Sequence, residues 1–347
     1  MKSRIEGVGI KAMSVAVPQK NIRVIDYLQC PDKKNIERVI RKTGIDSIRV
    51  SSPNQTTADF CKVAADSLFE SNYNKSSICA ILFVSKTPDN VVLPPTSCLL
   101  QDRLGLGEEV LCYDSMAACY GFVGGLQLAG LLASSFGKDV LLLTGDTNSK
   151  IMSIKDSSSV MFGDGGAASI IGPMHDKFID LHIKNKGSYA NLAYVKSGGF
   201  RNPVNVESLK LKPDERGNER SDCNMTLSGL DMMNFVLGDV ADLIKETIAE
   251  YKGAESYFDV FALHQPNEMI VKSLIKCLGI PEDKVPLHVN GYGNISSASI
   301  PLSLCLRYQE THEKPNMVLL AGFGGGASWG TSVTNLSETD FYPIREI

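Results

Sequence analysis

Short apolar runs typical of buried strands alternate with helical patterns along most of this chain. Strands that are apolar on both faces must be covered by helices on both sides, so the alternation predicts an α/β architecture. The predicted strands are 78–86, 138–146, 259–267 and 316–326, together with a strand pair around a glycine-rich bend at 160–172. The predicted helices are 57–71, 94–104, 119–135, 229–251, 267–278 and 297–311.

The two halves of the chain follow the same order of elements. In each, a strand leads to a loop, then to a small-residue turn that opens a helix, and then to a strand that ends in a glycine turn. The small-residue turn lies at Cys119 in the first half and at Asn294 in the second, and the closing glycines are Gly145 and Gly322. The similar spacing predicts an internal duplication.

We divide the chain accordingly into an N-terminal half, residues 1–180, and a C-terminal half, residues 181–347. The stretch 187–228 is polar, contains glycine and proline, and shows little periodicity. We interpret it as a surface excursion between the halves. A long loop of this kind in a compact domain is usually a lid, a binding wall or a mobile segment.

The composition argues against several classes of protein. Lys and Arg total 35 against 39 for Asp and Glu, and the net charge of −4 lacks the basic excess typical of nucleic-acid binding. No apolar run reaches the roughly 18 residues that span a bilayer, and the first residues lack the apolar core of a signal peptide.

The nine cysteines include no CxxC pair, which leaves a zinc site without support. We therefore predict a reduced, cytoplasmic protein without membrane insertion, whose cysteines are mostly small core residues.

Three polar residues lie where catalytic groups collect in α/β proteins. Cys119 and Asn294 each precede a predicted helix, and His264 ends a predicted strand. Each has a structural interpretation by itself: a small buried thiol, a helix N-cap and a histidine satisfied by its neighbours. Their combination is what favours a catalytic site.

The motifs around these residues resemble those of one enzyme family, the β-ketoacyl-acyl-carrier-protein synthase III group of thiolase-fold condensing enzymes. The resemblance runs nearly end to end and implies two similar halves stacked as five αβαβα layers, in a homodimer. The matching segments are RKTGIDSIRV (41–50), DSMAACYGF (114–122), MFGDGGAA (161–168), LHQPN (263–267), YGNISSASIP (292–301) and FGGGASWG (323–330).

The resemblance implies a Cys–His–Asn site in which Cys119 is the nucleophile and His264 and Asn294 lie beside it. Relatives that elongate acyl chains have a second histidine, so Asn294 points to the initiating type. The glycine loop lacks the second cysteine of thiolases proper. The backbone N–H groups of Cys119 and Gly325 would form the oxyanion hole.

The implied reaction is a decarboxylative Claisen condensation by an acyltransferase. Cys119 takes an acyl group from an acyl-CoA-type thioester, and its position at a helix N-terminus favours the thiolate. A malonyl thioester on an acyl carrier protein then loses carbon dioxide, and the enolate is stabilised by His264 and Asn294. Its attack on the acyl-cysteine gives a β-ketoacyl thioester. The implied chemistry needs no metal, nucleotide or prosthetic group.

Substrate contacts are also implied by position in the family. Arg38 stands where many members stack a tryptophan on the coenzyme A adenine, and Met269 stands where they have an arginine implicated in carrier docking. The basic residues between 33 and 42 either contact coenzyme A phosphates or a carrier, or form a solvated helix face. The implied substrate-binding residues are Arg38, Lys42, Leu93, Lys150, Asn267 and Met269.

Two other functions remain open at this point. The same acyl-Cys119 would serve an acyltransferase that passes its acyl group to an alcohol or amine, with His264 as general base. A non-catalytic partner subunit would retain the fold, but such copies usually lose the nucleophile. The acyl group itself is not indicated by the sequence.

Overall fold

Two long antiparallel strands form the spine of the computed structural model, which describes residues 1–30, 32–215, 217–251 and 254–347. These strands are β1 (Lys2–Val17) and β7 (Asp164–Asn185), paired along almost their whole length. The first part of β7 pairs with one half of the sheet and its last part with the other half. Residue 180, where we divide the chain, therefore lies within a strand that both halves share.

The two halves of the sheet are built alike. In strand order they are β7-β6-β4-β5 and β14-β13-β12. The pairs β7–β6 and β14–β13 are antiparallel, and the next pairs, β6–β4 and β13–β12, are parallel. This arrangement agrees with the internal duplication. The bounds are β4 (Ile78–Val84), β5 (Leu111–Ser115), β6 (Asp139–Thr147), β12 (Val260–Leu263), β13 (Met317–Gly324) and β14 (Ser328–Asn335), with β15 (Asp340–Phe341) and β16 (Arg345–Glu346) parallel to β1.

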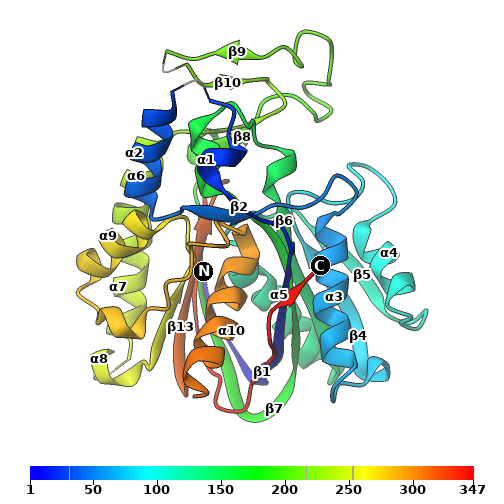
Figure 1. Cartoon of the computed structure of the whole chain (residues 1–347). Helices are drawn as coiled ribbons and strands as arrows, with labels where there is room; N and C mark the ends of the chain where they lie inside the picture. The colour runs from blue at the N-terminus through cyan, green and yellow to red at the C-terminus, as the bar shows by residue number, and fades with distance from the viewer. Residues whose placement is uncertain (31, 216, 252–253) are drawn as a thin grey trace.

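The helices make three layers around these strands (Figure 1). Helices α5 and α10 lie in the middle, α3 and α4 cover one outer face, and α7 and α9 cover the other. Separate apolar cores fill the layers between them. The bounds are α3 (Thr57–Phe69), α4 (Thr96–Arg103), α5 (Gly121–Phe136), α6 (Gly229–Phe235), α7 (Ala241–Ala249), α8 (Ala254–Tyr257), α9 (Glu268–Leu278) and α10 (Ser299–Thr311). A π-helical turn, η5 (Val236–Val240), joins α6 to α7.

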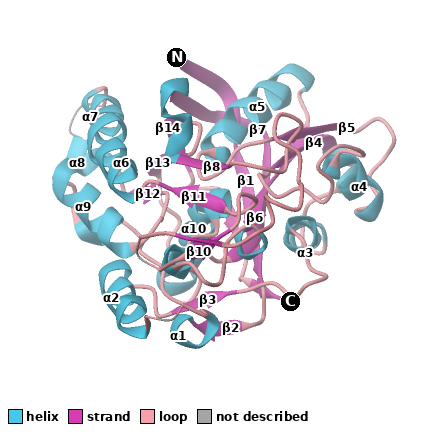
Figure 2. Ribbon diagram, turned by 90° about the horizontal axis from the view of Figure 1, so that it is seen from above, coloured by secondary structure: helices cyan, strands magenta, loops and turns pink. Residues whose placement is uncertain are grey.

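The excursion at 187–228 lies over the centre of the molecule when seen from above (Figure 2). Two short antiparallel strand pairs organise it, β8 (Ala193–Val195) with β11 (Met225–Leu227) and β9 (Lys212–Pro213) with β10 (Glu219–Arg220). An ion pair between Arg220 and the buried Asp156 ties it to the body of the protein. Beside it lie α1 (Val24–Tyr27), α2 (Lys33–Thr43), β2 (Asn21–Arg23) and β3 (Ser47–Arg49).

The strand pair predicted at 160–172 is wrong. Residues 157–161 form a 3₁₀ turn, because the Asp156 side chain accepts a hydrogen bond from the Ser158 N–H, and a single strand then starts at Asp164. The neighbouring glycines mark close packing instead of a bend. A Cβ on Gly166 would lie 2.8 Å from the backbone N of Cys61, which belongs to α3.

The predicted glycine turn at 145 is also wrong, since β6 continues to Thr147. A Cβ on Gly145 would lie 2.4 Å from the carbonyl oxygen of Gly165, so glycine is needed there for strand approach. The second predicted glycine turn, at 322, falls inside β13 in the same way.

The cysteines depart from the prediction that most lie in the core. Cys30, Cys61 and Cys305 are buried, Cys98 and Cys277 are exposed, and the other four are partly exposed; none is in a disulfide. Among the helices in the described part of the chain, none combines the length and apolar composition that crossing a bilayer requires.

Candidate active site

Cys119 lies in a tight turn between the end of β5 and the start of α5. The Gly121 N–H donates to the Ala118 carbonyl over 2.7 Å. Glycine is required at 121 because a Cβ there would lie 2.8 Å from a methyl carbon of Val84. From the other half of the protein, Gly324 at the end of β13 contacts Cys119, and a Cβ at 324 would lie 3.0 Å from the Cys119 Cβ. The predicted small-residue turn before a helix is therefore present.

His264 follows β12 and is 2% exposed. Its backbone N–H donates to the Ala321 carbonyl over 2.7 Å, and its Nδ1 lies 2.7 Å from the Ser299 Oγ. Its ring contacts Phe323 edge to face, with 5.1 Å between centroids. Burial, reinforced by the positive charge of Lys86, lowers the pKa of His264 to about 3. The imidazole is therefore neutral at physiological pH, with one ring N–H to donate.

Asn294 is held by backbone and side-chain hydrogen bonds together. Its N–H donates to the Met161 carbonyl over 2.7 Å, and its own carbonyl accepts from the Gly163 N–H over 3.2 Å. Its Oδ1 accepts from the Ser296 N–H over 2.8 Å. With Oδ1 engaged in this way, Nδ2 is the group of the amide that can donate toward the Cys119 sulfur.

The backbone at residues 161–163 crosses closely over that at residues 292–294, and this contact predicts that a side chain at Gly163 lowers the stability of the fold. A Cβ on Gly163 would lie 1.9 Å from the Tyr292 carbonyl oxygen, and a backbone atom cannot move aside as a flexible side chain can. We expect Gly163→Ala to lower the free energy of unfolding by about 1–3 kcal/mol, measured by denaturant or thermal unfolding. Gly187→Ala is the matched control, since no atom lies within 4 Å of its added Cβ. Equal stability of the two variants would contradict this account of the crossing.

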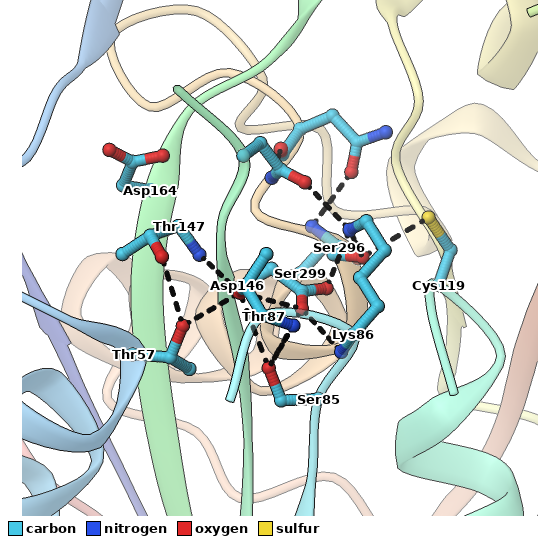
Figure 3. A network of polar contacts seen from close by, with 12 residues as sticks. Thr57, Ser85, Lys86, Thr87, Cys119, Asp146, Thr147, Asp164, Ser296 and Ser299 are labelled. Carbon is cyan, nitrogen blue, oxygen red and sulfur yellow. Dashed lines mark hydrogen bonds and ion pairs between the residues drawn. The ribbon is translucent and has the colours of Figure 1, made fainter. Parts of the chain in front are cut away.

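Ser296 and Lys86 complete the surroundings of Cys119 (Figure 3). The Ser296 Oγ lies 3.5 Å from the Cys119 Sγ and accepts from the Lys86 Nζ over 3.1 Å. Neither residue was identified by our sequence reasoning. The sequence signal for Lys86 is its position close to the end of a buried strand. His264 lies at the end of a buried strand in the other half of the chain.

The pKa of the Cys119 thiol is raised above its ordinary value, and burial is the main cause. The negative charge of Asp146 acts in the same direction. The charge of Lys86 and hydrogen bonds from the Ser296 and Asn294 side chains oppose the shift. Burial thus acts against ionisation of Cys119, whereas its position before α5, from which a stabilised thiolate is predicted, favours it. The polar neighbours of Cys119 therefore matter for how readily it ionises.

The implied substrate residues fall into two groups, of which the first lies on α2 and α9. These helices pack against each other, and Arg38 and Lys42 are exposed on α2. Met269 is partly exposed in the first turn of α9. Asn267 is buried, and its side chain caps α9 by accepting from the Ile270 N–H over 2.9 Å. Asn267 thus has a structural role in the fold whether or not it contacts substrate.

The second group lies apart from α2 and α9. Leu93 is 75% exposed in the described chain, and Lys150 donates to the Ser52 and Pro53 carbonyls. Gly325 follows the glycine that contacts Cys119, and Ala193 of the excursion lies against it. The excursion therefore forms a wall beside the glycine loop. In the described residues, no group of His, Cys, Asp and Glu is arranged to hold a metal ion.

Two family models match the segments that hold these side chains. The model for 3-oxoacyl-[acyl-carrier-protein (ACP)] synthase III covers residues 113–187, and the model for its C terminal covers residues 249–336. Cys119 lies in the first segment, and His264 and Asn294 lie in the second.

Curated relatives extend the similarity to most of the chain. A β-ketoacyl-[acyl-carrier-protein] synthase III from Natranaerobius thermophilus is 30% identical over 302 residues, covering 84% of this chain and 88% of the relative. This chain belongs to the β-ketoacyl-[acyl-carrier-protein] synthase III family. The synthase III of Campylobacter jejuni strain RM1221 is 29% identical over 338 residues, covering 96% of this chain and 99% of the relative.

Solved structures of synthase III proteins show the same fold. A 3-oxoacyl-(acyl-carrier protein) synthase from Burkholderia xenovorans LB400 has a TM-score of 0.92 at 29% identity, covering 100% of this chain and 99% of that chain. A second synthase III structure has a TM-score of 0.89 at 31% identity, covering 94% and 99%. The thiolase-type fold expected from the motifs is confirmed.

Proposed function

We propose that this protein is an acyltransferase that condenses an acyl thioester with a malonyl thioester, with loss of carbon dioxide, to give a β-ketoacyl thioester. Membership of the synthase III family supports the reaction class. The observation that carries the proposal is the convergence of Cys119, Asn294 and Ser296 at the start of α5, with a neutral His264 beside Ser299 and the Ser296 backbone.

The first step is transfer of the acyl group to Cys119. The thiolate attacks the carbonyl carbon of the acyl thioester, and coenzyme A leaves as its thiol with the proton that Cys119 has lost. The tetrahedral oxyanion accepts hydrogen bonds from the N–H groups of Cys119 and Gly325. The contact between Gly324 and Cys119 supports this pairing, because it brings the glycine loop to the sulfur.

The second step is decarboxylation of the malonyl thioester. As carbon dioxide departs, negative charge develops on the thioester oxygen of the enolate. The Asn294 amide and a ring N–H of His264 donate to that oxygen. If the Ser299 hydroxyl donates to Nδ1, the ring proton lies on Nε2 and faces the substrate. The enolate carbon then attacks acyl-Cys119, and the Cys119 thiolate leaves.

A low pKa for His264 favours condensation over acyl transfer to an alcohol or amine. A general base works best with a pKa near the operating pH. An imidazole with a pKa of about 3 is a weak base at neutral pH, but it remains a hydrogen-bond donor. We therefore assign His264 to enolate stabilisation.

The setting we propose is a cytoplasmic homodimer that uses acyl-CoA and an acyl carrier protein, without a metal or other cofactor. Free cysteines throughout the chain suit a reducing compartment. Monomeric proteins rarely expose large apolar side chains in one place, so a second copy is proposed to cover the 91–93 segment and its surroundings. The exposed apolar residues there are Val91, Val92, Leu93 and Met116.

The test is intact-protein mass spectrometry after incubation with a panel of acyl-CoA and acyl-carrier thioesters. We expect one acyl adduct, located on Cys119, whose mass identifies the donor. Addition of a malonyl thioester should remove the adduct and give a product two carbons longer. Transfer of the adduct to an amine or alcohol, with no two-carbon extension, would contradict the proposal.

A further inference from the structure

A lysine lies largely buried behind the reactive sulfur. The Lys86 side chain is 16% exposed, and Lys86 lies two residues after the end of β4. Its Nζ donates to the Asp146 Oδ2 over 2.8 Å, to the Asn148 Oδ1 over 2.7 Å and to the Ser296 Oγ over 3.1 Å. An ammonium has three N–H donors, so these contacts use all of them and fix its position.

Asp146 holds Lys86 from the side of β6. Its carboxylate is fully buried and also accepts from the Ser85 Oγ over 2.9 Å and from the Lys86 backbone N–H over 2.8 Å. A buried carboxylate with this many donors needs no further partner. Lys86 is therefore held on a rigid strand pair, and its remaining N–H is aimed at Ser296 (Figure 3).

Ser296 lies between this lysine and the sulfur. Its φ is +58°, in the left-handed region that serine seldom adopts, and its backbone N–H is fixed by the Asn294 Oδ1. Because its Oγ accepts from Lys86, its hydroxyl proton is free to point at the Cys119 Sγ, 3.5 Å away. A hydroxyl that accepts from a cation is a stronger donor to an anion.

We propose that Lys86 is a positioning residue for Cys119, acting through Ser296: it orients and polarises the Ser296 hydroxyl, which donates to the Cys119 thiolate. The inference rests on the proposed function, in which that thiolate accepts the acyl group. The charged groups that act on Cys119 are Lys86 and Asp146, which oppose each other, and His264 is neutral. Since burial raises the thiol pKa, a donor that favours the thiolate has a clear use at this position.

The test measures the reactivity of Cys119 without any acyl substrate. Alkylation by iodoacetamide is followed across a pH series by mass spectrometry of the peptide that contains Cys119, with the exposed Cys98 and Cys277 as internal references. We expect Lys86→Met to raise the apparent pKa of Cys119 by about one unit, which is about tenfold less thiolate at neutral pH. Lys62→Met is the control, since Lys62 lies on the outer helix α3 and pairs with Asp66 of the same helix.

Two further variants separate the relay from a direct effect of the charge. Ser296→Gly removes the hydroxyl and suits the left-handed backbone, and we expect it to raise the apparent pKa as Lys86→Met does. Combining the two should add little more, because both remove the same hydrogen bond. Lys86→Met with Asp146→Asn keeps the test valid if the unpaired carboxylate unfolds the single variant. A rise in the apparent pKa is still expected from the lost polarisation of Ser296, but a smaller one, because the Asp146 charge that raises the pKa of Cys119 is removed as well.

The result that would overturn the inference is an unchanged pKa in Lys86→Met, or independent shifts that add in the double variant. A protein that shows the expected alkylation shifts but no condensation would refute the proposed function instead. A protein that condenses normally with no alkylation shift would refute only the role of Lys86.

Discussion

Cys119→Ala should abolish covalent acyl uptake and lower condensation by on the order of 10⁴-fold or more, because the sulfur is the only atom in the mechanism that carries the acyl group. The turn that contains residue 119 should keep its structure, since alanine is smaller than cysteine and retains the Cβ against which Gly324 packs. Radiolabelled acyl-CoA and intact-protein mass measure the first effect, and product formation measures the second.

The variant should still decarboxylate the malonyl thioester slowly, since His264 and Asn294 remain in place. Cys277→Ala is the matched control, because Cys277 is an exposed thiol in the last turn of α9, and its loss should change neither measurement. Covalent uptake of label by Cys119→Ala would mean that another residue is the nucleophile.

His264→Ala should slow condensation while leaving acyl loading of Cys119 largely unchanged. We expect acyl-Cys119 to form within a few-fold of the normal rate, because a neutral imidazole adds no charge near the sulfur. Condensation should fall by about 100- to 1,000-fold, the usual loss when one donor to a developing oxyanion is removed. Single-turnover kinetics with a preloaded acyl-enzyme distinguish the steps.

His175→Ala is the control for this variant, since the His175 side chain is 93% exposed. A melting curve shows whether the loss of the His264 contacts with Ser299 and Phe323 has disturbed the fold. If His264→Ala slowed acyl loading as much as condensation, the assignment of His264 to the enolate step would be wrong.

The parts of the fold that the sequence predicts are those with a repeating pattern. The alternation of apolar runs and helical periods marks the parallel strands and the covering helices, and the repeated order marks the two halves. Cys119, His264 and Asn294 could be grouped because each follows or precedes such an element, and those ends meet at one edge of an α/β sheet. Their catalytic roles stay predictions.

The parts that the sequence does not predict depend on contacts between distant segments. The local pattern predicts turns at Gly145 and Gly166, but their need for glycine comes from neighbouring strands and from α3. The sequence does not mark Lys86, because a lysine after a strand is usually solvated. Its burial depends on acceptors far along the chain, above all the carboxylate of Asp146, 60 residues away. The sequence does not distinguish Ser296 from the other two serines of SSAS. Its left-handed φ and its contact with the Cys119 sulfur are visible only in the structure.

In the proposed reaction, Cys119 holds an acyl group that a decarboxylating malonyl thioester removes. The most direct test is a single turnover of preloaded acyl-Cys119 with a malonyl-carrier thioester labelled in its free carboxyl group. We predict one equivalent of labelled carbon dioxide and one of β-ketoacyl thioester for each acyl group lost from Cys119. Loss of the acyl group without labelled carbon dioxide would contradict the account.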